Sequence, residues 1–291
     1  MEIAITGAGG FLGTELLRQL SAFKDITVTA FTFDFERERT TFIRSENIFP
    51  VDNGEAADFD FSDTDVLINC AFPRNADDAG FAEGLIFLQR VIEKAASDGV
   101  GAVINISSQS VYSQQRREPA NEDFPIITES KYAVGKYFSE LFVNSVCRKI
   151  RHTNLRMASL IGAGFNQRIT NKFAMRVRDG EQITISGGNQ LFGFLDVRDA
   201  ASGIIAAALS DCGWAEAYNL GTNEAYRLLD IAAEAVSVGR SFGYSAPDPI
   251  SNESENWQNS ALDCNKFQNE FSWHPKYDLK ATLSEIFKAF D

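Results

Sequence analysis

Two side chains four residues apart have the types and spacing for proton-transfer chemistry. Tyr132 and Lys136 stand at the ends of the run Tyr-Ala-Val-Gly-Lys. On a helix, residues i and i+4 share one face, so the phenol and the amine would lie side by side. A free phenol is a poor base near neutral pH, and a neighbouring ammonium favours the phenolate. We interpret the pair as an acid/base device; a half-exposed tyrosine beside a solvated lysine is the alternative that spacing alone leaves open.

A glycine-rich turn at the start of the chain predicts a dinucleotide site. A short apolar run is followed by Gly7, Gly10 and Gly13, and apolar residues then recur at helical spacing. Glycine permits a tight turn, a close approach of backbone to a pyrophosphate, and close packing of helix on strand. The helix N-terminus, with Phe11 and Leu12 in its first turn, would direct backbone amides and the positive end of its dipole at the phosphates. We therefore expect these five residues to bind the cofactor.

Apolar runs that alternate with helical stretches predict the elements that position these residues. The runs cover residues 2–6, 26–31, 66–70, 103–107 and 153–157. A parallel sheet with helices on both faces produces this alternation. We expect an α/β fold, a doubly wound parallel sheet of the Rossmann type, with a smaller C-terminal substrate-binding lobe.

The pattern becomes less regular past Gly162, where glycine and proline interrupt it. We expect residues 1–162 to form the dinucleotide-binding domain, with 191–222 returning to it, and residues 163–190 and 223–291 to form the substrate lobe. Within the returning segment, a strand end and an alanine-rich helix follow one another. Asp196 and Asp199 lie at their junction, and Asp199 is expected to cap the helix rather than to serve acid/base or metal chemistry.

Three motifs in combination resemble the extended short-chain dehydrogenase/reductase family. They are the N-terminal glycine turn, the segment Ile104-Asn-Ile-Ser-Ser-Gln-Ser-Val-Tyr-Ser113 and the tyrosine–lysine pair. Within that family the chain is most similar to the NAD-dependent epimerase/dehydratase group, which modifies nucleotide sugars. Looser likenesses in residues 191–199, 218–222 and 273–275 extend the resemblance over nearly the whole chain.

The resemblance implies a catalytic role for three side chains. Ser108 would hold the reacting oxygen of the substrate, Tyr132 would take or give its proton, and Lys136 would activate the phenol and bind the nicotinamide ribose. The cofactor, NAD or NADP, would carry the hydride. The implied activity is that of an NAD(P)-dependent oxidoreductase, epimerase or dehydratase of a nucleotide-activated sugar. For the neighbouring Ser107 and Ser110 we expect loop capping instead.

The preference between NAD and NADP depends on residues after the second predicted strand. Asp34 could reach the ribose hydroxyls of NAD, whereas Arg37 or Arg39 could pair with the 2′-phosphate of NADP. A solvated charged loop is an equally good interpretation of these residues. Asp52, which follows a further apolar run, is expected to contact the adenine amino group.

Phe192 stands where the resemblance implies an arginine that clamps the nucleotide diphosphate. A phenyl ring cannot donate a hydrogen bond. Cations that could compensate are Arg168, Lys172, Arg176 and Arg227. The phenylalanine favours an alternative activity, NAD(P)H-dependent reduction of a small carbonyl substrate. A non-catalytic dinucleotide-binding sensor is another alternative, but such a protein would not need the tyrosine–lysine pair.

The composition disfavours several classes of partner. The 291 residues include 27 Lys+Arg and 40 Asp+Glu, and the net charge of −13 disfavours binding to nucleic acid. Four dispersed cysteines and two histidines form no metal-type cluster, so no metal is expected. The first strand begins too early to leave room for a signal peptide, and no apolar run approaches membrane-spanning length. We expect a cytoplasmic protein that binds no membrane.

Two predicted helices carry more apolar residues than one neighbour would cover. They hold Leu85, Phe87 and Leu88 on one helix and Tyr137, Phe138, Leu141 and Phe142 on the other. The resemblance implies that such helices pair across a two-fold axis, so a homodimer is expected. Burial within a single chain would leave the same signature.

Overall fold

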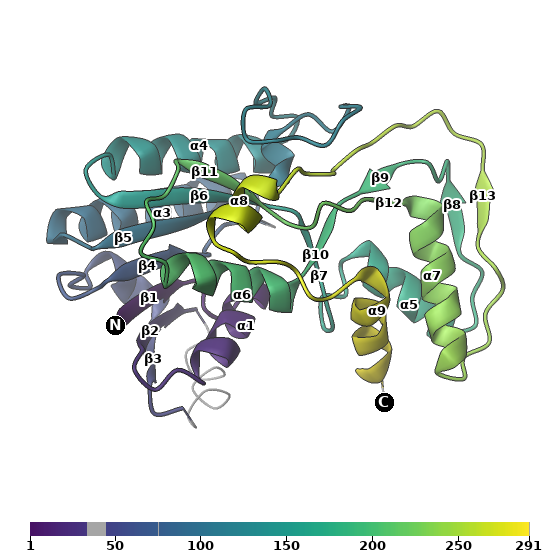
Figure 1. Ribbon diagram of the computed structural model, residues 1–291, viewed down its shortest axis with the longest axis horizontal. Coiled ribbons are helices and arrows are strands. Elements are labelled where there is room, and N and C mark those ends of the chain that lie inside the picture. The colour runs from purple at the N-terminus through teal and green to yellow at the C-terminus, as the bar shows by residue number, and fades with distance from the viewer. Residues whose placement is uncertain (34–44, 75, 291) are drawn as a thin grey trace. The chain divides into compact units, whose positions relative to one another are not determined.

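The computed structural model describes residues 1–33, 45–74 and 76–290 (Figure 1). The chain divides into two compact units. Unit 1 comprises Met1–Val111, Thr128–Arg156 and Ile204–Tyr218, and unit 2 comprises Tyr112–Ile127, Met157–Gly203 and Asn219–Asp291. The division expected from the sequence, with residues 1–162 and 191–222 serving the cofactor, concerns function and remains a prediction.

A seven-stranded sheet forms the centre of unit 1, in the order β11-β6-β5-β4-β1-β2-β3. The strands are β1 (Glu2–Thr6), β2 (Thr27–Thr32), β3 (Ile48–Asp52), β4 (Val66–Asn69), β5 (Ala102–Ser108), β6 (Arg151–Met157) and β11 (Ala217–Leu220). Strand β1 pairs in parallel with β2 and β4, and the pairs β2–β3 and β4–β5 are also parallel. All four residues of β4 are buried, as expected for a strand covered on both faces.

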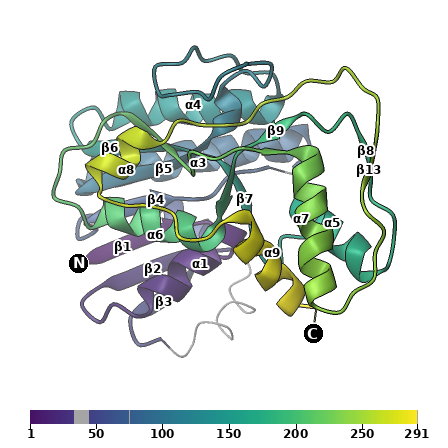
Figure 2. The same ribbon diagram turned by 45° about the vertical axis from the view of Figure 1, so that its right-hand side comes forward.

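Helices cover both faces of this sheet. They are α1 (Phe11–Leu20), α3 (Asp78–Asp98) and α4 (Lys131–Val146), with short 3-10 turns η1 (Asn53–Ala57) and η2 (Gln109–Val111). The chain moves one way across the sheet from β1 through α1 to β2, and the other way from β4 through α3, β5 and α4 to β6. Because such crossovers are right-handed, α1 lies on one face and α3 and α4 lie on the other (Figure 2). This arrangement confirms the predicted doubly wound α/β fold.

Capping residues fix where two of these helices begin. The Asp77 side chain accepts a hydrogen bond from Gly80 N before α3, and Ser130 accepts one from Ala133 N before α4. Such caps satisfy one of the four free N–H groups at a helix start. Ser130 therefore sets the start of the helix that carries both Tyr132 and Lys136.

Unit 2 combines short strand pairs with a helical core. Its strands are β7 (Ser159–Ile161), β8 (Thr184–Ser186), β9 (Leu191–Phe192), β10 (Phe194–Asp196), β12 (Tyr226–Arg227) and β13 (Ile250–Asn252). Its helices are α5 (Ile169–Arg178), α7 (Leu228–Ser241), α8 (Asn265–Glu270) and α9 (Leu279–Lys288), while α6 (Val197–Ala208) begins in unit 2 and ends in unit 1. Apolar residues of α5, α7 and α9 pack into one buried cluster. No helix among the described residues is long and apolar enough to cross a bilayer.

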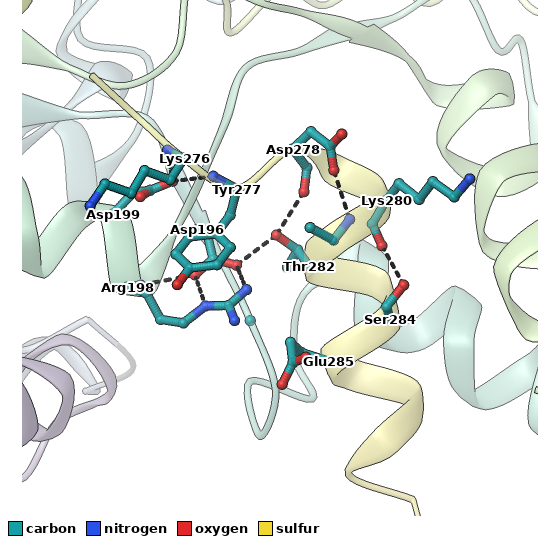
Figure 3. Close-up of polar contacts among 12 residues, drawn as sticks. Asp196, Arg198, Asp199, Lys276, Tyr277, Asp278, Lys280, Thr282, Ser284 and Glu285 are labelled. Carbon is teal, nitrogen blue, oxygen red and sulfur yellow. Dashed lines mark hydrogen bonds and ion pairs between the residues drawn. The ribbon is translucent and has the colours of Figure 1, made fainter.

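A buried carboxylate ties α9 to the start of α6 (Figure 3). Asp196 accepts hydrogen bonds from Nε and Nη2 of Arg198, each at 2.8 Å, and from Thr282 Oγ1 at 2.6 Å. The guanidinium carbon of Arg198 also lies 3.6 Å from the ring centroid of Tyr277. Both carboxylate oxygens of Asp196 thus accept hydrogen bonds, which limits the cost of burying its negative charge.

The prediction that Asp199 caps α6 is wrong. Asp199 lies in the first turn of the helix, and its Oδ2 accepts hydrogen bonds from the backbone N–H groups of Lys276 and Tyr277. Burial raises the pKa of this carboxyl, and the two backbone donors oppose the rise. The backbone N–H of Arg198 is bonded by Asp196 instead. The sequence could not show that a loop more than 70 residues later would supply the donors for Asp199.

Candidate functional site

The turn between β1 and α1 has no room for side chains. Gly7 has a φ of +66°, and a Cβ atom there would lie 2.7 Å from Ala71 N. A Cβ atom on Gly13 would lie 2.4 Å from the carbonyl oxygen of Gly7. Gly10 is the N-cap residue of α1 and makes no side-chain capping bond. The first turn of a helix directs backbone N–H groups and the positive end of the helix dipole toward its start, so a helix that begins directly after a glycine turn suits an anion.

A pocket of about 630 Å³ opens over this turn. It lies at the carboxyl ends of β1, β2 and β4, where ligands of open α/β sheets bind. Its lining comprises Gly7, Gly9, Gly10, Thr32, Phe33, Cys70, Ala71, Phe72, Pro73, Gly80, Glu83, Gly84 and Phe87. The lining is largely apolar with a glycine floor, which fits a dinucleotide whose pyrophosphate meets backbone amides.

Two acidic residues, Asp34 and Asp52, are expected to contact the adenosine part of the cofactor, and the structure describes only Asp52. Asp34 lies outside the described residues, as do Arg37 and Arg39. Asp52 ends β3, and its Oδ1 accepts a hydrogen bond from Gly54 N at 2.7 Å, which caps η1. Because β3 pairs in parallel with β2 and Asp52 is opposite Thr32, Asp52 lies at the same carboxyl end of the sheet as the pocket. Its contact with adenine stays a prediction.

Tyr132 and Lys136 share one face of α4, as the spacing predicts. Lys136 is 4% exposed, and its Nζ donates a hydrogen bond to the carbonyl oxygen of Ile106 in β5 at 2.6 Å. The same Nζ lies 6.0 Å from the ring centroid of Tyr132, which is half-buried. The lysine thus extends from the helix to the carboxyl end of a central strand.

Phe72, which the sequence reasoning missed, packs against both members of the pair. Its ring centroid lies 4.0 Å from Lys136 Nζ, and its ring meets that of Tyr132 edge-on at 5.3 Å. A Cβ atom on Gly135 would lie 2.5 Å from Phe81 and 3.1 Å from Phe72. A glycine inside a helix costs stability, so Gly135 within the tyrosine–lysine run was the available signal for this close ring packing.

The surroundings of Lys136 change its proton affinity. Burial lowers the pKa of its amine to about 7, while negative charge on Cys70 or Glu140 raises it and Arg74 lowers it further. Burial raises the pKa of the Cys70 thiol to about 12. A thiol with that pKa is neutral at pH 7, so Glu140 is the charge that opposes the effect of burial near neutrality. The sequence reasoning also missed Glu140, because its partners lie on strands β5 and β6, remote from it in the chain.

Ser108 is the last residue of β5 and lies two positions after the carbonyl that binds Lys136. Its Oγ accepts hydrogen bonds from the N–H and the hydroxyl of Ser110, the latter at 2.9 Å. Ser110 therefore orients Ser108. Loop capping was the wrong prediction for Ser107, whose buried hydroxyl donates to Glu140 on α4. Ser108 and Lys136 thus meet the same end of β5, on the edge where α4 begins.

Four cations in unit 2 were candidates to bind the diphosphate in place of an arginine at position 192. Each of them either contacts another residue of the unit or is exposed to solvent. Phe192 stacks on Phe194 with ring centroids 5.9 Å apart, and Phe194 stacks on Tyr226. Arg227 pairs with Asp230 on the surface. Of the others, Arg168 stacks on Phe165, Arg176 donates to the carbonyl of Gln182, and Lys172 is exposed. An aromatic stack therefore occupies the place where a guanidinium was expected.

Comparison with known proteins decides the family. The model of the NAD dependent epimerase/dehydratase family matches residues 3–221. The chain belongs to this family. The match spans the glycine turn, the strand that ends at Ser108 and the helix of Tyr132 and Lys136, so the family resemblance drawn from those motifs is confirmed.

Similar proteins cover the chain from end to end. Low-salt glycan biosynthesis protein Agl12 of Haloferax volcanii is 22% identical over 312 residues, which cover 97% of this chain and 96% of that protein. A dTDP-glucose 4,6-dehydratase of Streptomyces griseus is 22% identical and covers 97% of this chain and 92% of its own. Among solved structures, UDP-glucuronic acid 4-epimerase from Bacillus cereus, in complex with UDP-glucuronic acid and NAD, has a TM-score of 0.84 at 21% identity, covering 99% of this chain and 98% of that chain. The family match, together with the similar dehydratase and epimerase, confirms the predicted enzyme class, and the solved structure confirms the fold.

Proposed function

We propose that the protein is an NAD-dependent enzyme that oxidises and epimerises, or dehydrates, the sugar of a nucleotide-activated substrate. One observation carries the proposal: a buried lysine reaches from α4 to the carboxyl end of β5, beside Tyr132 and in the same unit as a glycine-floored pocket. Burial disfavours the charged form of a lysine, so a buried lysine is costly and is more typical of a functional site than of a structural core.

Each predicted site residue has a role in this proposal. Gly7, Gly10, Phe11, Leu12 and Gly13 would present backbone amides to the pyrophosphate. Asp52 would contact adenine, and Asp34 the ribose. NAD is favoured over NADP because similar solved structures contain NAD.

Three side chains would act on the substrate. Tyr132 would take the proton of a sugar hydroxyl and later return it, Ser108 would hold that oxygen, and Lys136 would stabilise the phenolate and bind the nicotinamide ribose. The nicotinamide, when bound, supplies the capacity to accept a hydride from the sugar and give it back. The protein contributes alignment and charge.

Unit 2 would hold the nucleotide part of the substrate. A polar pocket of about 580 Å³ in this unit is lined by Gln115, Arg117, Gln190, Glu255, Asn256, Trp257 and Gln258. The guanidinium carbon of Arg117 lies 4.5 Å from the Trp257 ring centroid. Amide and guanidinium donors beside an aromatic ring suit sugar hydroxyls and phosphate oxygens, and they offer an alternative to a clamp at Phe192.

We also propose a cytoplasmic homodimer. Ile86 on α3 and Val134 and Leu141 on α4 are about half exposed. A second copy that covers these two neighbouring helices would bury this apolar surface. Leu88, in contrast, is buried in the core of unit 1 and is unavailable to a partner.

Product analysis tests the activity. The protein is incubated with NAD and, separately, with UDP-glucose, UDP-glucuronic acid and dTDP-glucose, and products are identified by NMR and mass spectrometry. We expect an epimer or a dehydrated sugar from at least one of them. The matched Tyr132→Phe variant should bind NAD but convert about 10²–10⁴-fold more slowly. Equal turnover by this variant contradicts the roles given to the pair.

The stacked Phe192 favours one other activity, reduction of a small carbonyl compound. It predicts that NADPH or NADH is consumed with small ketones or aldehydes while all three nucleotide sugars stay unchanged. The same incubations, followed by absorbance of the reduced cofactor, separate the two activities.

A further inference from the structure

Glu140 lies one helical turn beyond Lys136 and belongs to a cluster of buried polar side chains in unit 1. Glu140 is 2% exposed, Arg156 is 7% exposed and Ser107 is 3% exposed. Arg156 donates to both carboxylate oxygens, with Nη2 2.8 Å from Oε2 and Nε 3.1 Å from each oxygen. The Ser107 hydroxyl donates to Oε1. The three side chains come from α4, β6 and β5, so the cluster ties the helix of Tyr132 to the two strands beneath it.

Stability alone is a weak reason for this arrangement. Removing two charges from water costs several kcal/mol per ion, and well-packed apolar residues in their place are often as stable. A buried ion pair therefore invites the question of what else it does. One candidate is an effect on Lys136, which lies four residues before Glu140 on the same face of α4.

Among the residues that the structure describes, none forms an ion pair with the ammonium of Lys136. Its Nζ donates to a backbone carbonyl and faces the Phe72 ring, and neither group carries a full negative charge. The titratable or charged groups around it are Cys70 and Arg74 after β4, with Tyr132 and Glu140 on its own helix. Cys70 is neutral near pH 7 because burial raises its pKa to about 12, and Arg74 repels an ammonium. Of these groups, Glu140 is thus the one whose negative charge favours the ammonium near neutral pH.

We propose that Glu140 is a positioning residue that acts through Lys136: held by Arg156 and Ser107, it favours the charged form of the buried lysine and fixes α4 where that lysine reaches the end of β5. This inference rests on the proposed function, because a charged Lys136 matters for a Tyr132 phenolate. Glu140 touches neither cofactor nor substrate in this proposal. A cluster that only holds the helix in place would leave the proton affinity of Lys136 unaffected.

The test measures the titration of Lys136 directly in the full-length protein. Lysine labelled with ¹³C at Cε reports the charge of each amine by NMR, and the Lys136→Arg variant identifies the signal. Glu140→Gln should lower the titration midpoint of Lys136 by one pH unit or more. Asp196→Asn is the matched control, since it neutralises a carboxylate held by an arginine and a hydroxyl in unit 2; it should leave the midpoint unchanged.

A double variant separates charge from folding. Glu140→Gln removes the negative charge that pairs with the buried Arg156 and is expected to destabilise the protein, whereas Glu140→Gln with Arg156→Met removes both charges of the pair. The double variant should unfold in urea near the wild-type midpoint, yet still show a lower Lys136 titration midpoint than the wild type. A wild-type midpoint in a folded double variant overturns the proposal. Failure of the double variant to fold also overturns it, because the cluster would then serve folding.

Activity measurements at two pH values then test whether the charge of Lys136 matters for the reaction. With a nucleotide sugar that the wild type converts, the double variant should lose activity at pH 8 about tenfold or more and recover part of it at pH 6.5, where a larger fraction of Lys136 is protonated than at pH 8. Affinity for NADH, measured by fluorescence, identifies any loss that arises from cofactor binding. If the wild type converts none of the nucleotide sugars, the proposed function fails, while the NMR titration still decides whether Glu140 acts on Lys136.

Discussion

Two buried carboxylates, one in each unit, are held by the same kinds of partner, an arginine and a hydroxyl. Glu140 receives two-pronged hydrogen bonds from Arg156 and one from the Ser107 hydroxyl, and Asp196 receives the same from Arg198 and Thr282. Both carboxylates are at most 2% exposed. In both units an arginine and a hydroxyl therefore stabilise the buried negative charge through charge-assisted hydrogen bonds.

The two regions differ in what lies beside the carboxylate. Next to Glu140, one helical turn away, is a buried lysine whose ammonium donates to a backbone carbonyl and lies over an aromatic ring. Next to Asp196 are the half-buried Arg198 and the backbone of the segment before α9, which Asp199 binds. The same cluster can thus serve as a fixed charge for another residue or only as a joint between elements. Which role it has depends on its neighbours and not on its own hydrogen bonds.

Removing Lys136 should produce the largest difference between the two regions. Lys136→Met keeps a long side chain but no charge, so turnover of a nucleotide sugar should fall about 10³-fold while the protein remains folded. The free energy of unfolding at pH 6 should stay equal or rise, because a desolvated charge is removed. Steady-state kinetics and urea unfolding measure the two effects. A variant that keeps more than a tenth of wild-type turnover contradicts the role given to Lys136.

Removing the arginine of the other region should affect stability alone. Arg198→Met leaves the Asp196 carboxylate buried without its ion-pair partner, which should cost about 3 kcal/mol of unfolding free energy. The kcat of the variant that remains folded at 25 °C should match the wild type. A loss of kcat without a loss of stability would assign the Asp196 region to the reaction and end the contrast.

The pH dependence of stability sharpens the comparison. Lys136 has a pKa of about 7 in the folded chain against 10.5 for an ordinary lysine. Between these values the unfolded chain holds the proton and the folded chain does not, so the free energy of unfolding rises with pH. From pH 7 to pH 9 the wild type should gain about 2 kcal/mol relative to Lys136→Met. Urea unfolding at both pH values measures this gain.

The upper limit of that window comes from Cys70. Its folded pKa of about 12 lies above the ordinary value of 9.0, so above pH 9 the unfolded thiol loses its proton first, and the contribution of Cys70 to stability falls and offsets the gain from Lys136 up to pH 10.5. The Asp196→Asn variant should follow the wild-type change between pH 7 and pH 9. A wild type with no gain over Lys136→Met in this range would show that the lysine is not desolvated as the fold indicates.

Two helical glycines provide a matched pair with a smaller effect. A Cβ atom on Gly135 would lie 2.5 Å from Phe81, and one on Gly239 in α7 would lie 2.3 Å from Val177. Alanine at either position should cost about 1–3 kcal/mol, because the neighbouring side chains must shift. Gly135→Ala should also reduce kcat several-fold, since Phe72 and Lys136 would move, whereas Gly239→Ala should not. Equal kcat in the two variants would show that the rings at α4 tolerate displacement.

The smallest expected effect comes from the two hydroxyls. Ser107→Ala and Thr282→Val each remove one donor to a buried carboxylate and should cost about 1 kcal/mol in urea unfolding. Only Ser107→Ala should also change the Lys136 titration, by less than Glu140→Gln does. A larger change in Thr282→Val than in Ser107→Ala would contradict the assignment of roles to the two regions.

Much of the fold followed from local patterns. The runs at residues 2–6 and 153–157 are strands, because apolar residues flanked by turns give buried parallel strands. For strand β3 the sequence indicates no more than an apolar run, since Pro50 weakens the strand signal. Tyr132 and Lys136 share a helix face because their spacing leaves no other outcome once Ser130 starts the helix.

The partners of these residues could not be predicted in the same way. Phe72 reaches Lys136 from the loop after β4, and Arg156 reaches Glu140 from a strand further along the chain. The donors to Asp199 come from a loop more than 70 residues later, which explains the wrong prediction that it caps α6. Each of these contacts joins residues remote in the chain, where periodicity carries no information.

The amino-acid sequence by itself determined the alternating elements, the glycine turn and the helical spacing of the phenol and the amine, because each depends on backbone geometry within a few residues. Only the tertiary structure decided that Lys136 is buried against the end of β5, that Glu140 is held one turn beyond it, and that Asp196 repeats the cluster without such a neighbour. Burial and electrostatic interaction act through space between strands and helices that the chain order separates, so the environment that tunes a charge exists only after the sheet has formed.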